Sequence, residues 1–243
     1  MSASKVLADL KSESSVRHAF EQQRFYKTAP GEYGEGDVFL GISVPKTRKI
    51  AGEYPNLTFD EIEKLAKSDF HEVRLCALVI LCNQYKKSKE LKKKKAIFDF
   101  YLVQVVKGRV NNWDLVDVSA PTIGQYLVES SNSMPILREL SKSKDLWERR
   151  IAMIFTFAHL RAGELEPTYE ISEHLLKDEH DLIHKAVGWM LREMGKRDPS
   201  LLRAFLTEHS RVMPRTMLRY SIEKFSERER KMWLAQSKAS ERL

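Results

Sequence analysis

The sequence predicts an all-α solenoid, in which short helices pair and the pairs stack along one axis. Helical spacing of apolar residues dominates the 243-residue chain, and no segment shows the alternating pattern of a half-buried strand. Ten glycines and eight prolines are few enough to allow long helices. Because 42% of the residues are hydrophobic and 31% are charged, we expect a globular domain that buries its own core.

Helix starts are well marked along the chain. Thr58 precedes Glu61 with the spacing of a capping box, and Asp69 is placed to cap the helix that follows. Asp198 before Pro199 predicts another start, because Asp caps helices and proline fits the first turn. Four further prolines mark expected starts: Pro45, Pro135, Pro167 and Pro214. These signals predict helices of about ten to twenty residues joined by short loops.

One segment departs from this pattern. Residues 26–41 include the stretch Gly31-Glu32-Tyr33-Gly34-Glu35-Gly36-Asp37, which has no helical period. The stretch lacks the Lys-Ser/Thr ending of a P-loop and no strand precedes it, so it does not predict nucleotide binding. We expect an irregular glycine-rich loop inserted in a single domain that spans residues 1–243.

A weak internal repeat supports the solenoid. Residues 73–77, 149–153 and 183–187 each place a cationic or polar residue before an apolar run that contains small residues. The Asn112-Trp113 block falls about midway between the first two, and Arg215 follows the third at a similar interval. A period of about 35 to 40 residues is typical of HEAT-type helix pairs. We therefore expect a crescent with a basic concave face, although these cations could also be simply solvated.

The charge and the cysteines limit the partners and the compartment. A formal net charge of +7 favours a polyanionic partner, and no apolar run reaches the ~18 residues of a membrane span. The N-terminus lacks the apolar core of a signal peptide, so we expect a cytoplasmic protein. Cys76 and Cys82 are six residues apart in a helical pattern, about 9 Å, which predicts reduced core thiols.

The most informative stretch is residues 111–121, in which Trp113 and Asp117 are four residues apart. In a helix this spacing puts both side chains on one face. A carboxylate beside an aromatic face suits a cationic guest or transition state. Downstream lie Arg149, Arg150 and Trp189, and arginines suit phosphate. Taken singly, each residue has a structural explanation: a core tryptophan, a surface or capping Asp, or an ion pair of Asp117 with an arginine.

Three blocks, taken in order, resemble the AlkD-like DNA alkylation repair family, a superfamily of HEAT-like-repeat DNA glycosylases. The blocks are residues 112–117 (NWDLVD), 147–152 (WERRIA) and 185–193 (KAVGWMLRE). The similarity runs from about Phe39 to about Phe225, which is most of the chain.

The resemblance implies a site and a reaction. It implies that Asp117, Trp113 and Trp189 are catalytic residues and that Arg150 binds phosphate. The implied activity is excision of cationic N7- and N3-alkylpurines from double-stranded DNA, without a metal or cofactor and without drawing the lesion into a pocket. Separately from the resemblance, we expect a monomer. The DNA-contacting cations that we expect are Arg150, Arg149, Arg74, Lys185, Arg192, Arg215 and Lys27.

Two alternatives remain open. Residues 25–37 resemble a subgroup of the superfamily, and a non-catalytic HEAT-repeat protein that binds bent or branched DNA is the main alternative. The other is a scaffold for an acidic protein. The lysines at 86, 87, 89 and 92–95 fit a solvated helix end or phosphate contacts. His180 and His184 have the spacing of metal ligands, but no third ligand completes a site, so we expect no metal.

Overall fold

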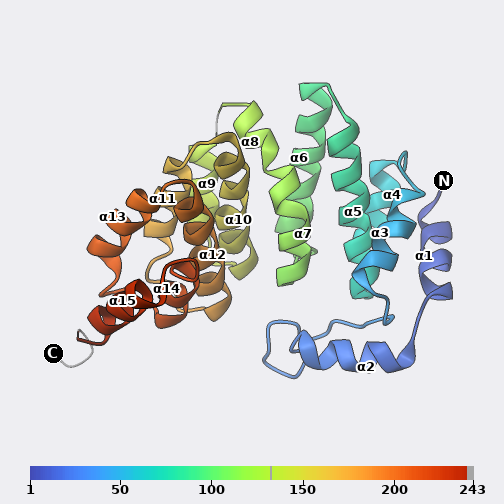
Figure 1. Cartoon of the computed structure of the whole chain (residues 1–243). Coiled ribbons are helices and arrows are strands. Elements are labelled where there is room, and N and C mark those ends of the chain that lie inside the picture. Colours follow the sequence, from blue (N-terminus) through green and yellow to red (C-terminus); the bar gives the residue numbers. More distant parts are fainter. Residues whose placement is uncertain (132, 240–243) are drawn as a thin grey trace. The chain divides into compact units, whose positions relative to one another are not determined.

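The computed structural model describes residues 1–131 and 133–239, and most of these residues are helical (Figure 1). Within the described residues no β-strand forms, and extended pairing is limited to an isolated bridge between Val38 and Phe70. The all-α prediction is therefore confirmed.

The helices group into two compact units, residues 1–126 and 127–243. The first unit contains α1 (Ala3–Ser12), α2 (Val16–Phe25), α3 (Val44–Gly52), α4 (Phe59–Ala66), α5 (His71–Lys87), α6 (Leu91–Val106) and α7 (Trp113–Ile123). The second contains α9 (Met134–Ser141), α10 (Leu146–Ala162), α11 (Glu166–His174), α12 (Asp181–Arg197), α13 (Pro199–His209), α14 (Arg215–Ser221) and α15 (Glu227–Ala239). The short helix α8 (Gln125–Glu129) begins in the first unit and ends in the second.

In the first unit, the helices form two layers. Helix α5 packs between α3 and α7, and α4 packs on α5 from the other layer, which also contains α6 (Figure 1). Every residue of α5 from His71 to Cys82 is buried. This arrangement is that of stacked helix pairs, in which neighbouring pairs share one continuous core.

The second unit repeats the same arrangement. Helix α12 packs between α10 and α14, while α9 and α11 pack against α10. The approach of α14 to α12 depends on Gly188, because a Cβ there would lie 2.5 Å from the Tyr220 Cβ and 2.6 Å from the Met217 carbonyl oxygen. Glycine at this position therefore sets how closely the two helices pack.

Most predicted helix starts are correct, and one is wrong. Asp198 caps α13 by accepting hydrogen bonds from the backbone N–H groups of Ser200 and Leu201, each at 2.9 Å. Thr58 is the N-cap of α4, but its hydroxyl makes no capping hydrogen bond. Asp69 does not cap α5, whose N-cap is Phe70. The Asp69 carbonyl instead accepts hydrogen bonds from Val38 and Arg74, so this residue anchors the preceding loop.

The two cysteines are buried free thiols, as predicted. Burial raises the pKa of both Cys76 and Cys82 to about 12, so both thiols are protonated at neutral pH. Among the described helices, none combines the length and the apolar character needed to cross a bilayer.

Candidate active site

Helix α7 carries the predicted Trp113 and Asp117 pair. Its N-cap is Asn112, a fully buried residue whose side-chain oxygen accepts a hydrogen bond from the Trp113 backbone N–H at 2.8 Å. Trp113 and Asp117 follow in the first turns, and both are half-buried. A buried cap thus fixes the start of the helix while two side chains one turn apart keep partial access to solvent.

The start of the glycine-rich segment packs against Trp113. The Tyr26 ring stacks on Trp113 with 5.5 Å between ring centroids, and also on Phe39 with 5.1 Å. Phe25 meets Trp113 edge-on at 5.7 Å. Such aromatic pairs contribute about 0.5–1.5 kcal/mol each beyond area burial. The start of this segment therefore holds the Trp113 ring in place, a contact that we did not predict.

Beneath these rings lies a buried polar network that sequence reasoning missed. His71, at the first position of α5, lies between two carboxylates: its Nδ1 is 3.0 Å from Asp37 and its Nε2 is 2.8 Å from Asp114. The Tyr26 hydroxyl donates to Asp114 at 3.1 Å, and the Asn112 amide donates to Asp37 at 3.2 Å. The network ties the glycine-rich segment, the start of α5 and the start of α7 together.

His71 and Asp37 stabilise each other's charged form in this network. Burial alone would lower the pKa of His71, but its hydrogen bonds to Asp114 and Asp37 outweigh burial and raise that pKa to about 9. Burial alone would raise the pKa of Asp37, but the His71 hydrogen bond and the charge of Arg74 lower it. At neutral pH the network therefore contains a protonated His71 between carboxylates.

A second buried carboxylate shapes the end of the glycine-rich segment. Glu72 accepts hydrogen bonds from the backbone N–H groups of Leu40, Gly41 and Ile42 at 2.8–3.0 Å. Gly41 has φ +79°, and a Cβ there would lie 2.0 Å from the Ser15 carbonyl oxygen. The segment consequently runs directly against the first turn of α2, and glycine is required at this point.

Arg74 belongs to this network, so a contact with DNA would compete with its buried partners. We expected Arg74 to contact DNA, but the residue is only 6% exposed. Its guanidinium donates to Asp37 and to the carbonyl oxygens of Ser68 and Asp69. We therefore leave Arg74 out of the DNA-contacting set, because a phosphate would have to displace buried partners.

The second unit carries the other two predicted site residues. Trp189 on α12 is half-buried, and its ring lies 5.9 Å from that of Phe157 on α10. Arg150 on α10 is 4% exposed, and one of its guanidinium donors bonds to the Leu182 carbonyl at 2.5 Å. A phosphate contact by Arg150 would therefore require a change in its surroundings.

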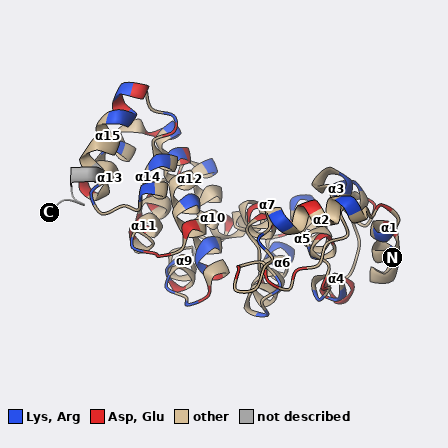
Figure 2. Ribbon diagram, turned by 90° about the horizontal axis from the view of Figure 1, so that it is seen from below, with Lys and Arg blue, Asp and Glu red and all other residues tan. Residues whose placement is uncertain are grey.

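Four of the remaining predicted DNA-contacting cations have partners within their own unit. Arg149 donates to Asp178 at 2.6 Å, and Lys185 pairs with Asp181 at 2.7 Å. Arg192 pairs with Glu223, and Arg215 donates to the Leu234 carbonyl at 3.1 Å. Lys27 is exposed, with φ +50°, in the glycine-rich segment. Basic and acidic residues are interspersed over the helices of both units (Figure 2).

His180 and His184, which have the spacing of metal ligands, form hydrogen bonds with nearby backbone groups. His180 accepts a hydrogen bond from the Leu182 N–H at 3.1 Å, and His184 donates to the Asp178 carbonyl at 2.5 Å. These contacts orient the two rings toward backbone groups at the start of α12.

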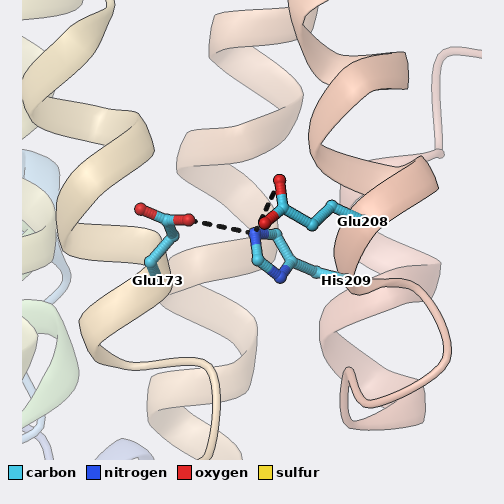
Figure 3. Close-up of side chains that lie close together, drawn as sticks. All are labelled: Glu173, Glu208 and His209. Carbon is cyan, nitrogen blue, oxygen red and sulfur yellow. Dashed lines mark hydrogen bonds and ion pairs between the residues drawn. The ribbon is translucent and has the colours of Figure 1, made fainter.

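A different cluster, at the ends of α11 and α13, contains possible metal ligands. The His209 Nε2 lies 3.1 Å from Glu173 and 3.9 Å from Glu208 (Figure 3). One imidazole and two carboxylates are a donor set that Zn²⁺ or Mn²⁺ accepts. The His209 ring contacts the same carboxylates directly, and both glutamates are exposed, so the cluster is explained without a metal.

The comparisons with known proteins agree with this architecture. A family model described as "DNA alkylation repair enzyme" matches residues 6–225. The chain belongs to this DNA alkylation repair enzyme family. No match was found among curated proteins.

Two solved structures are similar to the chain. One is a protein from Enterococcus faecalis described as a predicted DNA alkylation repair enzyme, with 17% identity and a TM-score of 0.71, covering 88% of this chain and 98% of that one. The other is AlkD2 from Streptococcus mutans, with 20% identity and a TM-score of 0.51, covering 87% and 98%. At these identities the similarity establishes the fold.

Proposed function

We propose that this protein is a monofunctional DNA glycosylase that hydrolyses the N-glycosidic bond of cationic N7- or N3-alkylpurines in duplex DNA. The observation that carries the proposal is the Trp113 and Asp117 pair on α7. Both side chains are half-buried, and a buried network fixes the turn from which they project. Membership of the DNA alkylation repair enzyme family supports DNA as the substrate.

The chemistry needs few protein groups. Alkylation at N7 or N3 makes the purine a cation, so the base leaves as a neutral molecule and takes the electrons of the glycosidic bond without a general acid. Positive charge then develops on the deoxyribose, where the Asp117 carboxylate stabilises it. Water adds to C1′ and loses a proton to Asp117 or to solvent. Trp113 presents an aromatic face to the cationic sugar and base. Trp189 of the second unit remains a site residue that the sequence predicts.

The test is release of 7-methylguanine or 3-methyladenine from methylated duplex DNA. A carboxylate that acts on the transition state contributes on the order of 3–4 kcal/mol, so Asp117→Asn should slow excision a few hundredfold. Because the substitution preserves size, DNA affinity should be almost unchanged. Equal excision rates for the two proteins would remove Asp117 from the mechanism.

A second candidate function rests on α2. None of its side chains is buried, and Val16, Phe20 and Phe25 are 90%, 67% and 65% exposed. Exposed aromatic rings near basic residues such as Lys27 suit stacking on unpaired bases in branched or bent DNA. A protein that lacks excision activity and binds a four-way junction more tightly than linear duplex would favour this function.

A further inference from the structure

We propose that Arg48, Asn83 and Lys86 form a phosphate-binding pocket on the first unit, which holds a backbone phosphate of DNA next to Asp117. The choice of DNA as the source of the phosphate rests on the proposed function. The pocket itself rests on separate observations from α3, α5 and α7.

The pocket is a small depression shared by the three helices of one layer. It has a volume of about 220 Å³ and is lined by Arg48 from α3, by Val79, Cys82, Asn83 and Lys86 from α5, and by Val118 from α7. Val79 lies three and four residues before Cys82 and Asn83, and Lys86 lies four and three residues after them, so the α5 residues share one helix face. The volume is below the roughly 300 Å³ at which small-molecule sites begin, and it suits a single phosphate group better than a nucleotide.

The charge in the pocket is uncompensated. Arg48 and Lys86 are both exposed, and neither forms an ion pair or hydrogen bond with any described residue. Both cations lie close enough to Cys82 for their charges to oppose the rise in its pKa that burial causes. Two cations with no carboxylate partner around one depression therefore create a site for an anion.

Other cations of the chain contrast with this pair. Arg109, Arg138 and Arg203 each pair with a glutamate at 2.5–2.9 Å. Within the lysine run, Lys95 pairs with Asp99 at 2.7 Å. Lys86 therefore differs from Lys95 at the far end of the lysine run, because it lines the pocket and has no carboxylate partner.

The donors match the chemistry of a phosphodiester. Arginine, lysine and asparagine side chains make many of the phosphate contacts in protein–DNA complexes. Asn83 is half-buried in the same lining as the two cations, where its amide can donate to a phosphate oxygen. Val118 directly follows Asp117 on α7, so a phosphate bound here lies beside the turn that carries the proposed catalytic carboxylate.

The experiment measures binding of undamaged, fluorescein-labelled duplex by anisotropy between about 50 and 200 mM salt. Arg48→Gln/Lys86→Gln should reduce the slope of log K against log salt by about one, because losing the contact with one phosphate removes about one released counterion. Arg48→Lys/Lys86→Arg should keep the slope. The matched control Lys89→Gln/Lys92→Gln removes the same charge from exposed lysines outside the pocket and should change the slope by less.

Equal slopes for the pocket and control variants, or no DNA binding by the unchanged protein, would overturn the proposal. Tight binding of inorganic phosphate in calorimetry with an unchanged DNA slope would also overturn it, because the pocket would then hold a free anion. Excision is not needed in this assay. A reduced slope in a protein without glycosylase activity would therefore refute the proposed function and leave the pocket standing.

Discussion

The network around His71 should make the stability of the first unit depend on pH in the alkaline range. His71 is 1% exposed and lies between Asp37 and Asp114, so replacing it with glutamine removes a buried charge that titrates. His71→Gln therefore tests how much the protonated imidazole contributes to the free energy of unfolding.

The magnitude follows from the pKa of His71. Its pKa is raised from 6.5 to about 9 in the folded protein, which corresponds to about 3 kcal/mol of stabilisation by protonation. Because the folded pKa is the higher one, this stabilisation is complete below pH 6.5 and is lost as pH rises through about 9. The difference in unfolding free energy between the unchanged protein and His71→Gln should therefore shrink by about 3 kcal/mol from about pH 6 to about pH 10.

The assay is urea unfolding followed by tryptophan fluorescence. Of the four tryptophans, Trp113 is the one within residues 1–126, so replacing the other three with phenylalanine makes the signal specific for the first unit. Its ring stacks on Tyr26, and this contact should make its emission sensitive to unfolding. His18→Gln is the control, because His18 is exposed on α2. If the difference in unfolding free energy between the unchanged protein and His71→Gln is the same at both pH values, the protonated His71 does not stabilise the first unit.

Two further predictions concern the glycine-rich segment. Tyr26→Phe removes the hydrogen bond to Asp114 but keeps the ring against Trp113. The free energy of unfolding should fall by about 1–3 kcal/mol, while the folded protein should keep its excision rate. A tenfold slower excision rate would contradict this prediction. Gly41→Ala places a Cβ 2.0 Å from the Ser15 carbonyl oxygen at φ +79°, so it should cost at least about 2 kcal/mol and speed hydrogen exchange in α2. Unchanged exchange there would show that α2 does not depend on this contact.

The helices could be predicted because their signals are local. Asp198 and Pro199 specify the start of α13 through contacts within three residues, and apolar spacing specifies which helix face is buried. Trp113 and Asp117 could likewise be placed on one face, since four-residue spacing is enough. Caps and residue spacings depend on a few neighbouring residues, so they can be predicted from the sequence alone.

The buried network could not be predicted because its members are far apart in the chain. His71 lies 34 residues from Asp37 and 43 from Asp114, and nothing in the sequence pairs them. The same contacts explain why Arg74 is buried, although its place near a helix start suggested an exposed cation. Asp114, next to Trp113, offered a local clue, because it is a second acid in the NWDLVD block that the predicted site did not use.

The central claim is that the Asp117 carboxylate stabilises the transition state of base loss. The most direct measurement is the single-turnover excision rate on a duplex with one 7-methylguanine, with the protein in excess, for the unchanged protein and Asp117→Asn. We predict an unchanged fraction of DNA bound and a rate constant that falls a few hundredfold. Excision by the unchanged protein no faster than spontaneous base loss, or equal rates for both proteins, would contradict the claim.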